Sequence, residues 1–142
     1  MNYKATEQMM IDDEGETFIL YKDSRGFWTI GIGYCIEKRG ISKKMSRMLF
    51  REVYNENIRD LDHIFTDVGF HTLPDNIQMV LFNMRYQLGY TGFRGFRRMI
   101  QAVKKYNWEE MIVEMKDSKW YHNFQDRADR LIALINEEIN YG

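Results

Sequence analysis

The chain has 142 residues, a length at which one domain buries most of the surface that its unfolded form exposes. Hydrophobic residues make up 44% of it and charged residues 29%, with a single proline, which excludes disordered, collagen-like and proline-rich proteins. The 20 basic and 21 acidic residues give a formal net charge of -1, and the lone Cys35 has no partner for an internal disulfide or a CxxC motif.

The first predicted elements are a short helix and a β-hairpin. Apolar residues among polar neighbours predict a helix over residues 5–13, with Thr6 or Asn2 as its N-cap. Two runs rich in β-branched and aromatic residues follow, separated by a turn in which Gly26 supplies the positive φ that a tight hairpin needs. A hairpin is therefore predicted over residues 16–34.

The rest of the chain is predicted to be helical. Ser42 is expected to cap a long helix that runs to about residue 66. A central apolar helix follows Pro74, with Asp75 as its cap, and ends at Gly89. Shorter helices are expected over residues 108–115, 117–122 and 126–138. The fold class is α+β, with a small sheet first and helices after it.

Basic residues are unevenly distributed along the chain. Residues 22–51 hold eight basic and two acidic groups, and residues 85–105 hold six basic groups and no acidic one. A basic face suits an anionic polymer, although a solvated helix face balanced by acidic neighbours is the simpler interpretation.

Two carboxylates and a hydroxyl lie around the predicted hairpin. Glu14, at the end of the first helix, can be shielded and keep its proton, whereas Asp23 in a polar turn stays ionised. Glycosidic cleavage uses such a pair, because one group protonates the leaving oxygen while the other stabilises the oxocarbenium-like centre or positions water. Thr29, on the returning strand, is suited to hold that water. From residue types alone, a solvated acidic patch around Glu14 is the alternative.

Eight residues separate Glu14 from Asp23 and five separate Asp23 from Thr29, and this spacing resembles that of the catalytic Glu, Asp and Thr of the T-even-type phage lysozymes. The likeness extends to other segments and covers most of the chain. These segments are Asp13-Glu-Gly15, Ile19-Leu-Tyr-Lys-Asp23, Trp28-Thr-Ile-Gly-Ile-Gly33, Asn83-Met-Arg-Tyr-Gln-Leu-Gly89, Thr91-Gly92, Gly95-Phe96, Trp108, Ser118-Lys-Trp-Tyr121 and Arg127-Ala128.

The resemblance implies a lysozyme of glycoside hydrolase family 24. Such an endolysin hydrolyses the β-1,4 bond between N-acetylmuramic acid and N-acetylglucosamine in peptidoglycan. By the same resemblance, Glu14 is the general acid, while Asp23 and Thr29 place the water in an inverting mechanism.

The resemblance also implies where substrate is bound. Tyr86 and Gln87 stand where the family presents an aromatic residue and a glutamine, and Arg127 stands where an arginine flanks the acid. At three further positions the family contacts glycan or stem peptide with other residue types. Met99 and Glu114 stand where the family has small polar groups, and Cys35 stands where it has an aliphatic one. The implied substrate-binding residues are Cys35, Tyr86, Gln87, Met99, Glu114 and Arg127.

Two further departures from the family lie just after the hairpin. Tyr34 replaces a histidine that the family often carries, so an imidazole-based support is absent and the pH behaviour should differ. Only five residues separate Cys35 from Ile41, far fewer than in the T-even members, so the outer part of the small sheet is expected to be trimmed.

The implied organisation is one lysozyme-like domain over residues 1–142. It consists of a small N-terminal β-hairpin lobe joined by a long helix to a mostly helical C-terminal lobe. The expected ranges are 14–41 for the small lobe, 42–66 for the connecting helix and 74–142 for the helical lobe, on which helix 1–13 packs.

Other residue types favour structural roles. Trp108, Trp120 and Tyr121 are expected to pack within the helical lobe rather than against sugars, and Phe96 to lie in its core. The three histidines are scattered without the spacing of metal ligands, so neither a metal nor a cofactor is expected.

The expected partner is peptidoglycan. No signal peptide or apolar segment long enough to cross a membrane is visible, so stable membrane insertion is not expected. The resemblance implies a monomer that is made in the cytoplasm of a host bacterium and reaches the wall through a separate holin-like pore.

Two alternative classes remain at this stage. A lytic transglycosylase needs the acid Glu14 but no water-placing pair, so Asp23 and Thr29 argue against it. The second class is a binding module, either a catalytically silent lysozyme fold on peptidoglycan or a nucleic-acid binder. Nucleic acid is disfavoured because the chain is not basic overall and carries no recognised binding motif. The basic residues such a binder would use are Arg94, Arg97, Arg98, Lys104 and Lys105.

Overall fold

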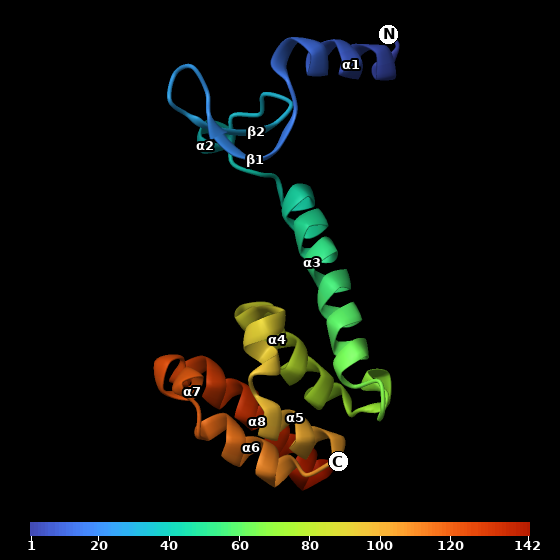
Figure 1. Cartoon of the computed structure of the whole chain (residues 1–142), viewed down its shortest axis with the longest axis vertical. Coiled ribbons are helices and arrows are strands. Elements are labelled where there is room, and N and C mark those ends of the chain that lie inside the picture. Colours follow the sequence, from blue (N-terminus) through green and yellow to red (C-terminus); the bar gives the residue numbers. More distant parts are fainter. The chain divides into compact units, whose positions relative to one another are not determined.

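The computed structural model describes all 142 residues. It consists of two compact units, Met1–Leu49 and Phe50–Gly142. Figure 1 shows the single hairpin within the first unit and a group of helices, α4 to α8, within the second. The predicted α+β fold, with a small sheet first and helices after it, is confirmed.

Helix α1 (Tyr3–Glu14) begins the first unit. The Asn2 side chain accepts a hydrogen bond from the Ala5 N–H at 3.1 Å, which satisfies one of the free donors of the first turn. Asn2 is therefore the N-cap, and Thr6 lies inside the helix. Gly15 ends the helix with a φ of 74°, in the region that favours glycine.

Strands β1 (Thr17–Lys22) and β2 (Trp28–Gly31) form the predicted antiparallel hairpin. Tyr21 lies opposite Thr29, and Gly26 in the turn has a φ of 83°, as its position in the sequence predicts. The sheet has these two strands alone.

A one-turn helix, α2 (Ile36–Arg39), fills the shortened segment after the hairpin. The Tyr34 hydroxyl donates a hydrogen bond to the Gly40 carbonyl at 2.6 Å, and the Arg39 guanidinium lies 5.0 Å from the centre of the Tyr34 ring. Tyr34 thus ties together the two ends of this short segment.

Helix α3 (Lys43–Ile64) begins as the sequence predicts. The Ser42 hydroxyl accepts a hydrogen bond from the Met45 N–H at 3.1 Å. The helix starts in the first unit and its later turns belong to the second.

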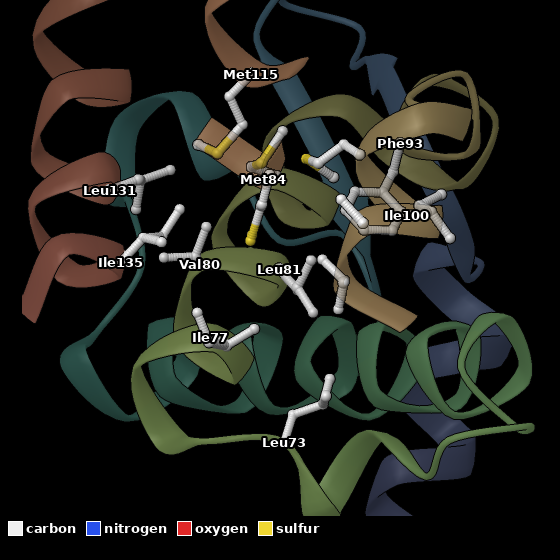
Figure 2. Packing of buried hydrophobic residues seen from close by; sticks show 14 of the residues in the cluster. Leu73, Ile77, Val80, Leu81, Met84, Phe93, Ile100, Met115, Leu131 and Ile135 are labelled. Atoms are coloured by element: carbon white, nitrogen blue, oxygen red, sulfur yellow. The ribbon is translucent and has the colours of Figure 1, made fainter. Parts of the chain in front are cut away.

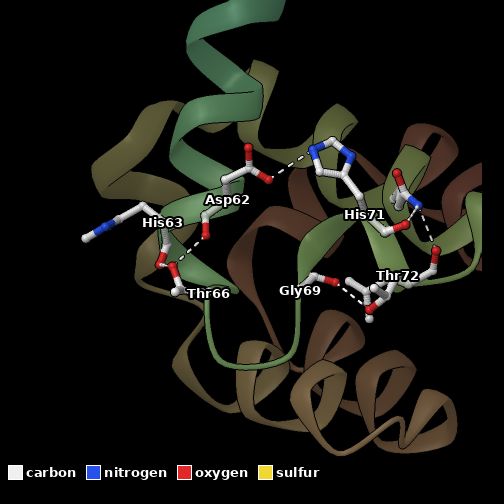
Figure 3. Close-up of polar contacts among 8 residues, drawn as sticks. Asp62, His63, Thr66, Gly69, His71 and Thr72 are labelled. Carbon is white, nitrogen blue, oxygen red and sulfur yellow. Dashed lines mark hydrogen bonds and ion pairs between the residues drawn. The ribbon is translucent and has the colours of Figure 1, made fainter.

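A network of short polar contacts follows the end of α3 (Figure 3). The Thr66 hydroxyl lies 2.7 Å from the Asp62 carbonyl oxygen, and His71 Nε2 lies 3.1 Å from Asp62 Oδ1. His71 belongs to the 3-10 turn η1 (Phe70–Thr72), which the sequence did not predict. The side chain of His63 points away from the Asp62–His71 pair.

Helix α4 (Asp75–Arg94) corrects one expectation. Asp75 is the first helical residue and not the cap, because the cap position is taken by Pro74, whose carbonyl accepts the Gln78 N–H at 3.0 Å. The predicted end at Gly89 corresponds to a break, since this residue has a φ of 74° inside the segment.

Four shorter helices complete the second unit: α5 (Arg97–Lys104), α6 (Trp108–Lys116), α7 (Lys119–Asn123) and α8 (Gln125–Tyr141). The Asn107 side chain caps α6 by accepting the Glu110 N–H at 3.1 Å. None of the helices combines the length and apolar composition that crossing a bilayer requires.

The hydrophobic core of the second unit is built around α4 (Figure 2). Ile77, Val80, Leu81 and Met84 recur at the spacing of one helical face, and all are buried. Trp120 is buried as well, and Phe96, Trp108 and Tyr121 pack against the core, which confirms their predicted structural roles. The other buried apolar residues are Leu61, Phe65, Phe70, Leu73, Phe93, Met99, Ile100, Ala102, Val103, Met111, Met115, Ala128, Leu131, Ile132 and Ile135.

Polar contacts attach the later turns of α3 to α4. Arg85 donates hydrogen bonds through Nε and Nη2 to Asp60 Oδ2. The fully buried Asn57 donates from Nδ2 to the Phe82 carbonyl at 3.2 Å, and its Oδ1 has no partner. These contacts fix how two helices of the second unit pack.

Candidate active site

Asp23 organises the turn of the hairpin. Its Oδ1 accepts hydrogen bonds from the Arg25 and Phe27 N–H groups, each at 2.9 Å. The bond from Phe27 is the main reason that the pKa of Asp23 lies below its ordinary value, and the Arg25 N–H and guanidinium add to this effect against a smaller opposing effect of burial. The expectation that Asp23 is ionised at neutral pH is supported by this direction.

Thr29 lies on β2 and is 2% exposed, which is unusual for a polar side chain. Its hydroxyl donates a hydrogen bond to the Phe27 carbonyl at 3.0 Å. Because the proton is used in this bond, the oxygen presents its lone pairs as an acceptor. Asp23 and Thr29 are therefore held by the N–H and the carbonyl of the same residue.

Glu14 is the last residue of α1, and its side chain lies against the backbone of Gly33, just after β2. A Cβ atom on Gly33 would lie 3.0 Å from Glu14 Oε2 and 3.2 Å from Glu14 Cβ. Gly33 also has a φ of 59°, which side chains rarely adopt. The backbone conformation at this position therefore favours glycine, and the residue lies close to Glu14. Glu14 is exposed, so the shielding expected from the sequence is not observed.

The Phe27 ring is surrounded by cations. Lys38 Nζ lies 4.3 Å from the ring centre and the Arg25 guanidinium carbon lies 5.4 Å from it. On the next residue, the Trp28 N–H donates to Glu37 Oε1 at 3.4 Å. Phe27 was not singled out from the sequence, since its contribution is made by its backbone and ring and no residue pattern marks it.

We predict that the Asp23 carboxyl titrates below the ordinary aspartate value of 3.8. Since the folded pKa is lowered, the hydrogen bonds to this carboxylate stabilise the turn above the unfolded pKa, and this stabilisation is lost as the pH falls through the folded pKa. Carbon-13 NMR of the side-chain carboxyl, followed with the Phe27 amide proton, measures both events. Separate midpoints for the two signals would contradict the assignment.

Three predicted substrate-binding residues lie on α4 and α8 of the second unit. Tyr86 is 44% exposed on α4. The neighbouring Gln87 accepts through Oε1 a hydrogen bond from Trp120 Nε1 at 2.8 Å, so its carbonyl is engaged within the fold. Arg127 donates through Nε to Asn83 Oδ1 at 2.8 Å, which attaches α8 to α4.

Two others line one cavity of about 520 Å³, between α5, α6 and α7. Met99 is fully buried and contributes to the core as well, whereas Glu114 is partly exposed. Desolvation, followed by a hydrogen bond with Glu110, raises the pKa of Glu114, and the charge of Arg98 opposes this. The remaining candidate, Cys35, lies at the start of α2 in the first unit and is partly buried.

Acidic, histidine and cysteine side chains do not gather in groups of three or more that could hold a metal ion. The candidate catalytic groups of the first unit are the carboxylates of Glu14 and Asp23 and the hydroxyl of Thr29.

Comparisons with known proteins identify relatives along most of the chain, and no family model matches it. The chain is 29% identical to the probable T4-type lysozyme 1 of Dictyostelium discoideum and 26% identical to the probable T4-type lysozyme 2 of the same organism; each match covers 92% of this chain and 93% of the relative. It is also 29% identical, over 90% of its length, to 27% of the pre-baseplate central spike protein Gp5 of Enterobacteria phage T4. With the α+β fold, these matches support a place for the chain in the phage T4-type lysozyme family and a glycoside hydrolase activity.

Proposed function

We propose that this lysozyme hydrolyses the β-1,4 bond between N-acetylmuramic acid and N-acetylglucosamine of peptidoglycan, with Glu14 as general acid and Asp23 and Thr29 holding the attacking water. The observation that carries the proposal is the shared attachment of Asp23 and Thr29 to the backbone of Phe27. Two acceptors held by one peptide segment keep a constant separation.

The hydrogen bonds of Asp23 and Thr29 define what they offer a water molecule. Asp23 is ionised and accepts only, and the Thr29 hydroxyl has already used its proton on Phe27. A water that donates one proton to each of them keeps a lone pair free for attack on the anomeric carbon. Asp23 takes up the proton that the water loses, as a general base.

Glu14 supplies the proton for the leaving oxygen. The proximity of its side chain to Gly33 supports a position next to the strand that carries Thr29. Attack by a held water on the face opposite the acid, without a covalent intermediate, inverts the anomeric centre.

Mass spectrometry of the muropeptides released from purified peptidoglycan tests the reaction. Products that end in reducing N-acetylmuramic acid are expected, with the α-anomer formed first in proton NMR spectra of a fresh digest. Anhydro-muramic ends would instead show a lytic transglycosylase, and the absence of products would indicate a silent binding module.

We further propose that Cys35, Tyr86, Gln87, Met99, Glu114 and Arg127 form the substrate-binding set that the family resemblance implies. The enzyme acts as a monomer and reaches the wall from the cytoplasm through a separate holin-like pore. The small-lobe, connecting-helix and helical-lobe ranges expected from the sequence remain the proposed organisation of the domain.

The pair of glycines around the end of β2 allows a controlled test of the Glu14 position. In Gly33→Ala, alanine must adopt a positive φ, and its methyl group lies 3.0 Å from Glu14 Oε2. In Gly31→Ala, alanine must adopt a similar φ of 66°, but no atom lies within 4 Å of the new methyl group. Both variants should lose about 1–2 kcal/mol of stability, but only Gly33→Ala displaces the acid. We expect it to lose at least tenfold more activity than Gly31→Ala, at a temperature where thermal unfolding curves show both to be folded. Equal losses would refute a fixed contact.

A further inference from the structure

Another cavity of the second unit, distinct from the residues assigned above, has three cationic side chains in its lining. It has a volume of about 330 Å³ and lies between the end of α3, the end of α4 and one face of α5. Arg94, Arg97 and Lys104 line it, and no acidic residue does. This is the same stretch of sequence, residues 85–105, that contains six basic residues and no acidic one.

The cations of this cavity are only partly neutralised within the protein. Lys104 Nζ lies 3.2 Å from the exposed Asp67, but neither Arg94 nor Arg97 has a carboxylate within 4.0 Å. Arg94 is instead held by Tyr90, whose hydroxyl accepts a hydrogen bond from Nη1 at 3.3 Å and whose ring centre lies 5.1 Å from the guanidinium. An arginine held by a neutral partner keeps its charge available for a ligand.

The cavity also offers neutral donors and an apolar floor. Gln101 lies one helical turn from both Arg97 and Lys104 on α5, and its amide contributes to the lining with the imidazole of His63. Ile64 and the almost fully buried Ile100 form the apolar part. Two guanidinium forks, an ammonium and an amide around one small volume match a group with several charged oxygens.

We propose that this cavity binds a phosphate group of a phosphodiester polymer of the bacterial cell wall. Apart from the imidazole of His63, the lining contains no aromatic ring on which a nucleic-acid base could stack, and it contains no exposed large apolar residue that could enter a bilayer. A flexible phosphate polymer needs neither. This inference rests on the proposed function only for the assignment of the polymer to the cell wall. The residues of the cavity are not among those assigned to cleavage.

Binding of the complete protein to poly(glycerol phosphate) at about 150 mM salt tests the proposal. The test variant is Arg94→Gln/Lys104→Gln, since these two residues line this cavity alone. The matched control is Lys116→Gln/Arg130→Gln, which removes the same two charges from exposed positions that have no ion pair. We expect the test variant to bind about tenfold or more weakly and the control to change less than twofold.

Several outcomes would overturn the inference. They are equal losses in the two variants, no binding by the wild type, binding to poly(glutamic acid) as tight as to poly(glycerol phosphate), or tighter binding to duplex DNA or to phosphatidylglycerol vesicles. The test variant should release muropeptides at the wild-type rate from peptidoglycan stripped of phosphate polymers, and a slower rate would place the cavity in the cleavage site instead. If the wild type binds the polymer but cuts no glycan, the proposed function fails while this site stands.

Discussion

Replacement of Glu14 by glutamine is expected to reduce the release of muropeptides by about 10³-fold or more while the protein remains folded. The amide has the shape of the protonated carboxyl group and fits against Gly33 as the acid does, but it has no proton to give to the leaving oxygen. Single-turnover rates on purified peptidoglycan, with thermal unfolding as the measure of folding, give the result.

Glu16 provides the control for this variant. It lies two residues further along the chain, is also exposed, and is a member of the same acidic segment. Glu16→Gln should retain nearly all of the activity. Comparable losses in the two variants would show that the charge of the segment matters and not the acid at position 14.

Asp23→Asn is expected to lower the rate by about 10²-fold or more. The asparagine Oδ1 accepts the same hydrogen bonds from the Arg25 and Phe27 N–H groups, so the turn is preserved and only the charge and the basicity of the group are lost. A fall in kcat with little change in KM is the expected pattern, because a proton acceptor acts in the transition state.

The companion variant Asp23→Ala separates chemistry from structure. It removes the acceptor of both N–H groups as well as the charge, so it should destabilise the hairpin turn in addition to lowering the rate. A normal rate for Asp23→Asn, with anhydro-muramic products, would replace hydrolysis by the transglycosylase mechanism. A normal rate with reducing products would remove Asp23 from the reaction.

The elements that could be predicted from the sequence are those fixed by local chemistry. Asn2 and Ser42 are caps because their short polar side chains reach back to the first turn, and Gly26 marks a turn because its φ is positive. The apolar spacing from Ile77 to Met84 gave the central helix because it repeats over several turns.

The features that could not be predicted depend on brief or distant contacts. Helix α2 has four residues, which are too few for a periodic pattern. The prediction that Asp75 caps α4 was wrong because Pro74 occupies the cap position. The bond between Gln87 and Trp120 joins residues 33 positions apart. No single-sequence pattern encodes a pair of that kind.

The candidate site shows the same division. Glu14, Asp23 and Thr29 are proposed from the family resemblance that their spacing carries, whereas the two bonds made by Phe27 could not be predicted because they use backbone atoms. The clearance that Gly33 provides for Glu14 is likewise a property of two segments brought together by the hairpin.

The attachment of Asp23 and Thr29 to one peptide segment has a consequence for how such enzymes can change over time. The two bonds use the N–H and carbonyl at position 27, so they do not depend on which side chain stands there, although the Phe27 ring itself contacts Lys38 and Arg25. Chain length between the two residues matters more, because an insertion or deletion that shifts the strand pairing by one residue turns Thr29 to the opposite face of the strand. A substitution at position 27 thus leaves both bonds in place, whereas a shift of the strand pairing separates Thr29 from Asp23.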